Sequence, residues 1–429
     1  MGFGFRNLGF PRQLSDLLWI SALSPAIVQH VSLRLPFADV DRRTAWLRGI
    51  LLSACFLGLL ASVPVWTNTH GFPMLPIARW FPILPSPLDK VLFGMMLLAL
   101  AVAAWFYRAA VSFFLFAGLF VFCEDQNRGQ PWFYMYWVML LLTLLPSATA
   151  IAACRCAVSA AYIWGGIQKF NPRFFEVVPR WFVAPATHWH LPSAAIDLLR
   201  WAVAAAPFVE LAIGLLLWVP RLRWWTLGGT LAVHLSALLF LGPLGYNYNW
   251  VVWPWNLAMI ALVGCLLAPG IGTTGAREAF FTRSLAELRR SKLALIVVGL
   301  YAFLPVFSYA GWWDSYFSFS LYAENAANAN IFVTPAFRNR LPPPMRAHVN
   351  PFPQAYDPAH QGPLVFAFQA WGYEAMRVPP IPEPRNFRSI FRFLRKYSKE
   401  PGDLRMIVGQ RAGRVIFLEG DRTELLKPK

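Results

Sequence analysis

The sequence predicts an all-α polytopic membrane protein of about nine transmembrane helices, followed by a small C-terminal extramembrane α+β domain. The chain has 429 residues, of which 57% are hydrophobic and 14% charged, whereas a soluble domain carries about 25% charged residues. Charged residues are scarce because the sequence contains long apolar runs, and after residue 310 these runs shorten to strand length. We therefore expect an N-terminal cytoplasmic segment (1–46), a helical membrane domain (47–309) and an exoplasmic C-terminal domain (310–429).

Several apolar stretches are long enough, or nearly long enough, for a bilayer crossing, which needs about 20 residues. They are 47–66, 91–106, 108–123, 132–154, 156–169, 201–219, 224–243, 250–268 and 293–309. The pair within 91–123 predicts either a tight hairpin or one long tilted helix. The expected count is about nine, give or take one.

Arginines in short loops predict the orientation of these helices, because basic residues are enriched on the cytoplasmic side. Arginines precede the first span, and alternation places Arg155 and the 277–292 loop on the same side as them. The loop 170–200 is the exception, since its arginines fall outside. We expect a multi-pass protein of the cell inner membrane with its N-terminus in the cytoplasm and its C-terminus exoplasmic.

The formal charge of +17 favours the lipid bilayer with its anionic headgroups as a partner, and not nucleic acid. The arginines lie in short loops and in the tail, and they form no basic helix. The pair Cys154 and Cys156 is too close for a normal disulfide and lacks zinc-site spacing. The cysteines therefore read as small apolar core residues, and no metal site is predicted.

The C-terminal part has the composition of a small folded domain. Two β-branched runs around a short turn, within 404–420, predict a β-hairpin. Proline-rich pieces such as RLPPPM are connectors between elements. The sequence contains no repeat of fixed period, and so it lacks the inverted-repeat signature of many transporters.

Few ionisable residues lie in predicted spans, where such groups are expensive, and Lys169, Glu210 and His234 are the candidates for function among them. Lys169 ends one span, and it is either a side chain that reaches the membrane surface or a functional base. Glu210 is either a protonated hydrogen-bonding group between helices or part of a site. His234 has the same two interpretations.

Gly165 and Gly166 come one helical turn before Lys169. Glycine leaves the backbone bare, so a helix or a flat ligand can approach it there. A lysine desolvated beside such a ligand can lose its proton near neutral pH and act as a general base.

Two predicted outer loops carry further polar residues beside tryptophans. Asp125 and Gln126 belong to EDQNRGQPW, and Asn247 and Asn249 belong to GPLGYNYNW. Such clusters are either helix caps in an aromatic belt or the lining of a polar vestibule.

The stretch from Tyr162 through Gly166 to Lys169, followed by Trp181, the central His234 and the Tyr-Asn-Tyr-Asn loop, resembles a known family. It is similar to the horizontally transferred transmembrane (HTTM) domain of vitamin K-dependent gamma-carboxylases and their bacterial relatives. The resemblance covers roughly residues 40–310. It departs from the family at Gln168, where a first lysine is usual, and in the tail, which is much shorter than the lumenal region of the animal enzyme.

The resemblance implies that Lys169 is the base that deprotonates reduced vitamin K or another quinone, with His234 as a second catalytic residue. The cofactor-binding residues that follow from this interpretation are Tyr162, Gly165, Gly166, Glu210, Asp125, Gln126, Asn247 and Asn249. The implied activity is that of a gamma-glutamyl carboxylase-like lyase acting on an exported peptide.

Two other functions stay open from the sequence. The chain also resembles lipase maturation factors, which have multiple spans and a similar asparagine-tyrosine stretch. A non-catalytic maturation or assembly factor that presents its outer domain to an exported client protein is therefore the alternative. A transporter is the third interpretation.

Overall fold

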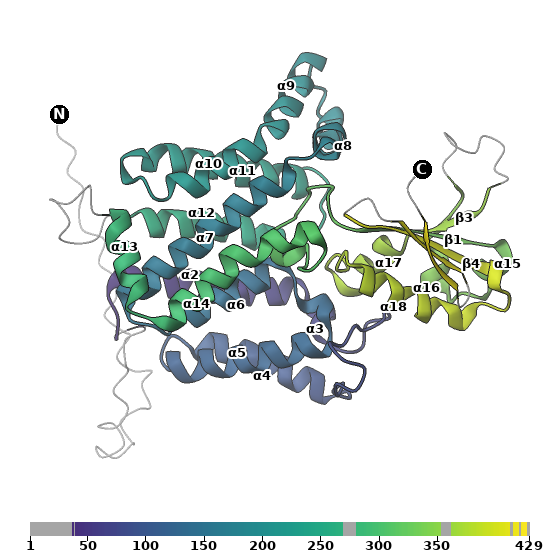
Figure 1. Ribbon diagram of the computed structural model, residues 1–429, viewed down its shortest axis with the longest axis horizontal. Helices are drawn as coiled ribbons and strands as arrows, with labels where there is room; N and C mark the ends of the chain where they lie inside the picture. Colours follow the sequence, from purple (N-terminus) through teal and green to yellow (C-terminus); the bar gives the residue numbers. More distant parts are fainter. Residues whose placement is uncertain are drawn as a thin grey trace, which may run out of the picture.

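A computed structural model describes residues 37, 39–268, 280–352, 362–411, 415–419 and 422–426. A helical bundle forms one end of the molecule and a sheet with its covering helices forms the other (Figure 1). Within the described residues, five helical stretches are long and apolar enough to cross a membrane, or six if one bent pair is counted as a single crossing. The predicted helical fold with several helices of membrane-spanning length, followed by a small sheet, is thus confirmed, and the described residues contain fewer full-length candidate spans than the nine predicted.

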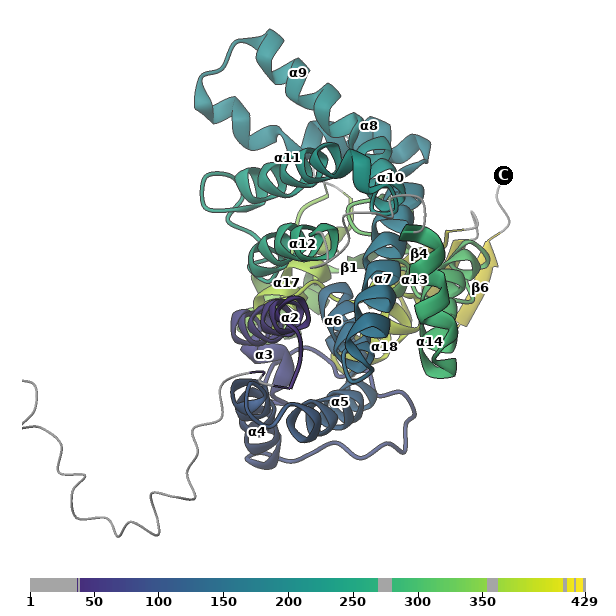
Figure 2. The ribbon, with the colours of Figure 1, turned by 90° about the vertical axis from the view of Figure 1, so that its left-hand side faces the viewer.

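The bundle contains α2 (Arg42–Ala61), α3 (Val63–Trp66), α4 (Leu88–Val102), α5 (Tyr107–Glu124), α6 (Pro131–Leu142), α7 (Ser147–Lys169), α8 (Pro172–Phe182), α9 (Ser193–Ala204), α10 (Ala206–Leu216), α11 (Arg223–Leu241), α12 (Val252–Leu267), α13 (Phe280–Arg289) and α14 (Lys292–Phe303). The five stretches are α2, α5, α7, α11 with the preceding turn, and α14 with the following 3₁₀ turn. Helix α7 lies inside the bundle and packs against α10, α14, α13, α6 and α12 (Figure 2). Helix α7 is therefore central to the packing of the bundle.

The structure corrects the predicted break at Arg155. Helix α6 ends at Leu142, and α7 runs unbroken from Ser147 to Lys169, so 132–154 and 156–169 are not the two spans. The real break is at Pro146, which precedes α7 and cannot continue a helix from before it. Arg155 is 3% exposed, and it donates to Ser284 Oγ at 2.8 Å and to the Leu266 carbonyl at 3.0 Å. A buried arginine is tolerated in a span when its neighbours supply acceptors.

Other predicted boundaries also change. The segment 170–200 is largely helical, since it contains α8 and the first part of α9. Helix α9 continues into α10 after a bend of 44°, so the predicted span 201–219 is the second half of a longer bent pair. Within 91–123 the chain forms the hairpin of α4 and α5, and not one long helix.

The C-terminal domain contains β1 (Asn328–Val333), α15 (Pro335–Arg340), α16 (Pro343–Arg346), β2 (Val349–Asn350), β3 (Leu364–Phe366), α17 (Phe368–Met376), α18 (Pro384–Leu394), β4 (Leu404–Gly409), β5 (Val415–Glu419) and β6 (Arg422–Leu426). The strands form one sheet in the order β2-β3-β1-β4-β5-β6, and every pairing is antiparallel. The predicted hairpin is confirmed as β4 and β5, with Met406 opposite Leu418.

Helices α17 and α18 lie between this sheet and the bundle (Figure 1). The ring of Phe72, from the loop after α3, contacts Trp371 of α17 with centroids 4.8 Å apart. Gly372 is required at this contact, because a Cβ there would lie 2.7 Å from the Phe72 ring. The domain is therefore seated directly on the end of the bundle where α7 ends.

Candidate functional site

Helices α7 and α10 approach each other closely because glycines face the contact. A Cβ on Gly166 would lie 2.7 Å from the Pro207 carbonyl oxygen, and one on Gly214 would lie 2.7 Å from Ile163 Cγ1. Small residues allow such backbone approach between membrane helices. Of the two partners that the sequence left open for Gly165 and Gly166, the structure places a helix, α10, in front of them.

Lys169 lies in the bundle beside Glu210. Its Nζ is 2.7 Å from Glu210 Oε2 and donates to the Gly165 carbonyl at 3.0 Å. The two side chains are only 10% and 13% exposed. The ammonium group of the lysine therefore points into the bundle and not out to the membrane surface.

A second polar chain runs from α7 to α12 through α11. The Tyr162 hydroxyl is 2.6 Å from His234 Nε2, and His234 Nδ1 is 2.6 Å from Asn256 Oδ1. The Asn256 amide nitrogen donates to the Val252 carbonyl at 2.5 Å, which leaves Oδ1 facing the imidazole as an acceptor. His234 therefore carries its proton on Nδ1, and its Nε2 accepts from Tyr162.

These two groups of residues adjoin each other. Tyr162 and Lys169 lie on the same helix, α7, and Glu210 of α10 and His234 of α11 lie on helices that pack against each other. The structure thus brings together six of the predicted site residues, namely Tyr162, Gly165, Gly166, Lys169, Glu210 and His234. Sequence reasoning missed Asn256, although an asparagine within an apolar helix is itself a signal of an expensive buried polar group.

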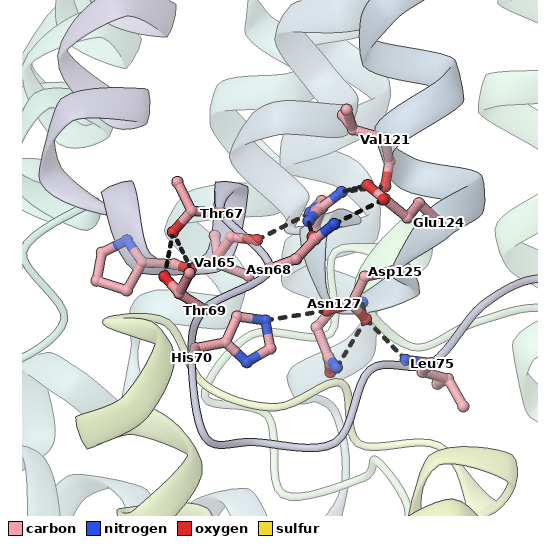
Figure 3. A network of polar contacts seen from close by, with 12 residues as sticks. Val65, Thr67, Asn68, Thr69, His70, Leu75, Val121, Glu124, Asp125 and Asn127 are labelled. Atoms are coloured by element: carbon pink, nitrogen blue, oxygen red, sulfur yellow. Dashed lines mark hydrogen bonds and ion pairs between the residues drawn. The ribbon is translucent and has the colours of Figure 1, made fainter. Parts of the chain in front are cut away.

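Asp125 and Gln126 have a different role, shown in part by Figure 3. Asp125 Oδ1 accepts from the Leu75 amide at 3.1 Å and from the Asn127 amide at 3.0 Å. Gln126 donates to the Pro76 carbonyl at 3.1 Å and accepts from Arg385 Nε at 2.7 Å. Asp125 is fully buried and Gln126 nearly so, so this loop forms no open polar vestibule. These residues fasten the loop after α3 and the C-terminal domain to the bundle.

Arg128 forms a buried ionic clamp in the same region. It donates to Glu124 Oε2 at 2.5 Å, to Asn68 Oδ1 at 2.5 Å, and to the Val65 and Val121 carbonyls at 2.8 and 2.9 Å. The residues that supply these acceptors, Glu124, Asn68, Val65 and Val121, are labelled in Figure 3. Arg128 and Glu124 are at most 1% exposed, so the clamp is structural.

Asn247 and Asn249 belong to the turn between α11 and α12, and the two residues differ. Asn247 shapes the turn, because its backbone N–H donates to the Gly242 carbonyl at 2.9 Å and its φ is 48°. Asn249 lines a pocket of about 530 Å³ between the bundle and the C-terminal domain. The side-chain amide nitrogen of Asn249 donates to the Tyr322 hydroxyl at 3.2 Å. Lys169, Glu210 and His234 are not among the residues that line this pocket.

Comparison of the chain with protein-family models, with curated proteins and with solved structures finds no match. Within the described residues, no group of three or more histidine, cysteine, aspartate or glutamate side chains is arranged to hold a metal ion.

Proposed function

We propose that this chain is a membrane-embedded enzyme of the gamma-carboxylase type, in which Lys169 and Glu210 exchange a proton during the modification of an exported peptide. The observation that carries the proposal is the buried contact of 2.7 Å between Lys169 Nζ and Glu210 Oε2, next to the Tyr162–His234–Asn256 chain. Ionisable groups within a membrane domain are costly and are retained mostly for function.

The quinone that the resemblance implies does not fit in front of Gly165 and Gly166. Helix α10 fills that space, with the Pro207 carbonyl 2.7 Å and Glu210 Oε2 3.0 Å from where Cβ atoms would be. A flat ring therefore cannot lie on these glycines, and no step of the proposal passes through one at this place.

The chain's own residues account for the proton. The bond between Lys169 Nζ and a hydrogen breaks as that hydrogen moves along the existing hydrogen bond to Glu210 Oε2, which leaves a neutral amine and a neutral carboxyl group. Burial reduces the cost of this neutral pair relative to the charged one, because desolvation penalises charge. The neutral amine can then accept a proton from a substrate.

Lys169→Arg tests the proposal, because arginine keeps a positive charge beside Glu210 but cannot lose its proton at neutral pH. Isolated membranes that contain the parent or the variant are supplied with labelled bicarbonate, a reduced quinone and candidate exported peptides, and the peptides are analysed by mass spectrometry. We expect label in the parent and none in a Lys169→Arg variant that inserts normally. Full turnover by that variant contradicts the base assignment.

A non-catalytic maturation factor is the second candidate, and one observation favours it. Gln168, which stands where the family has a lysine, anchors the C-terminal domain instead: its carbonyl accepts from Asn325 at 2.6 Å and its side chain donates to Ser308 Oγ at 3.2 Å. This second function is supported if membranes with the parent protein put no label into the peptides and an exported client protein is recovered in a complex with the full chain.

We further propose nine crossings, with the N-terminus cytoplasmic and the C-terminus exoplasmic. The five full-length stretches, the bent pair of α9 and α10, and the shorter α4, α6 and α12 together make nine. Helix α2 begins at Arg42, and the purple start of the described chain lies at the end of the bundle away from the C-terminal domain (Figure 1), which supports opposite sides for the two ends. Reporter fusions at both ends that report one compartment contradict this topology.

A further inference from the structure

The pocket of about 530 Å³ between the bundle and the C-terminal domain has no part in the proton chemistry proposed above. Its walls come from the start of α6, from α8, from the turn before α12 and from the segment 316–324. It is adjacent to the buried polar chain, because Val252 lines the pocket and the carbonyl of Val252 accepts from Asn256. Its position at the end of the bundle suggests a ligand that comes from the membrane.

The pocket wall contains residues in an unfavourable backbone conformation. Tyr322 and Glu324 have φ values of 50° and 54°, and Asn249 has 55°. A residue with a bulky side chain rarely adopts this left-handed conformation, and such strain persists where the surroundings hold it, often at ligand sites. Tyr322 is held by stacking on Trp181 at 5.7 Å and by its hydrogen bond with Asn249.

The wall also carries unused hydrogen-bonding capacity. Three residues of the wall each have a polar atom that is shielded from solvent and has no hydrogen-bond partner among the described residues, namely Asn249 Oδ1, Trp132 Nε1 and Trp255 Nε1. Buried polar groups without a partner are uncommon and call for an explanation. The polar side chains that line the pocket include neutral ones such as Gln130, Tyr248 and Ser320, and their amide and hydroxyl groups can pair with a ligand head that carries hydroxyl or carbonyl groups.

The charge of the wall restricts the head of that ligand. Among the residues that the structure describes, Glu324 is the only charged one that lines the pocket, and it already pairs with Arg173 at 3.5 Å. An ionised headgroup would therefore be buried without a counter-charge, which is costly. The pocket is suited to an uncharged head.

The mouth of the pocket suggests how such a ligand arrives. Val177 and Trp181 of α8 line the pocket and are 40% and 37% exposed. Phe170 and Phe175 add further exposed apolar surface at the start of α8. Apolar surface on an amphipathic helix at the end of a membrane bundle is typical of contact with lipid, so a molecule with an apolar tail can enter there.

We propose that this pocket binds an uncharged amphiphile, a molecule with a hydroxyl- or carbonyl-bearing head and an apolar tail, drawn from the leaflet that faces the C-terminal domain. A diacylglycerol-type lipid and an isoprenoid quinone share this chemistry. The inference is independent of the proposed function, because it requires no reaction at Lys169.

The experiment uses the full chain in lipid nanodiscs with three photoreactive probes: a diacylglycerol, an isoprenoid quinone and a phosphatidic acid. Labelled peptides are identified by mass spectrometry, and no turnover is measured, so failure here is separate from failure of the enzyme proposal. We expect saturable labelling of peptides that contain 172–182, 246–255 or 316–324 by one or both neutral probes. The neutral probe that labels these peptides identifies the source.

Val177→Trp narrows the mouth from an exposed position and should lower this labelling by about tenfold, which corresponds to about 1.4 kcal/mol of binding. Leu198→Trp on α9 is the matched control, because Leu198 is 70% exposed and does not line the pocket. Equal labelling of the two variants overturns the proposal. So does labelling of the same peptides by phosphatidic acid as strongly as by the neutral probes, or the absence of saturable labelling by either neutral probe.

Discussion

Arg128 and Lys169 are both buried cations paired with a glutamate, but their surroundings differ. Arg128 is completely buried, and four acceptors surround its guanidinium: Glu124, Asn68 and the carbonyls of Val65 and Val121. Lys169 is 8% exposed, and its ammonium group, which has three N–H donors, has two acceptors, Glu210 and the Gly165 carbonyl.

This difference is in how completely the donors of the two cations are held by acceptors. A guanidinium is always charged and is held in one geometry by its fork of donors, so Arg128 can only brace the chain. The ammonium group of Lys169 has fewer fixed partners than N–H donors, and the proposed function assigns the remaining donor to a substrate. Burial of a cation beside a carboxylate is therefore not by itself evidence of a functional site. The number of acceptors that hold the cation is the property that distinguishes Arg128 from Lys169.

Arg128→Met should have the largest effect on stability, because it leaves Glu124 buried without its cation. Breaking a buried pair in this way costs about 3–5 kcal/mol. Thermal unfolding of the purified protein in detergent measures it. Arg180→Met, at an exposed position of α8, is the control, and equal melting temperatures for the two variants would show that the clamp contributes nothing.

Lys169→Met should be less destabilising, at about 1.5–3 kcal/mol for a hydrogen bond to a charged group. Glu210 is 13% exposed and Glu124 only 1%, so losing the cation leaves a less completely buried carboxylate at Glu210, which limits the cost. Lys169→Arg should restore most of the stability while abolishing turnover. If Lys169→Met is destabilised as much as Arg128→Met, the two buried cations contribute equally to stability and the distinction between them is wrong.

His234→Ala should cost about 1–3 kcal/mol, because Tyr162 and Asn256 each lose a buried partner. Asn256→Leu should produce part of this loss and also free the imidazole to change its tautomer. Thermal unfolding and any turnover found are compared for both variants. If His234→Ala matches the parent in both measurements, the polar chain has no role.

The pH dependence of the C-terminal domain should give the smallest effect. Burial, together with the nearby carboxylate of Asp314, raises the pKa of Glu383 from 4.5 to about 7. Between these two values the folded state binds more protons than the unfolded state, so stability should fall as the pH rises from 4.5 to 7. Thermal unfolding over this range should show the decline, and Glu383→Gln should remove it. If the stability of Glu383→Gln falls with pH as much as that of the parent, the pH dependence comes from another titratable group.

Periodicity and composition were sufficient to predict the helical membrane domain, the small C-terminal domain and the hairpin of β4 and β5. Apolar runs and β-branched runs report local preferences, and they are visible in a single sequence. Helix ends were harder to place. A lone Arg155 looked like a loop residue, because nothing local shows that Ser284 and Leu266 supply its acceptors.

The sequence by itself determined that Lys169, Glu210 and His234 are the costly polar groups of the membrane domain, because an ionisable residue in an apolar run is conspicuous wherever it packs. Only the tertiary structure decided their partners. Glu210 is 41 residues from Lys169 along the chain, and Asn256 is 22 residues from His234, so these contacts depend on how α7, α10, α11 and α12 pack. The same packing placed α10 on the glycines and buried Asp125 and Gln126, since helix contacts are set by side-chain fit across the bundle and not by local sequence.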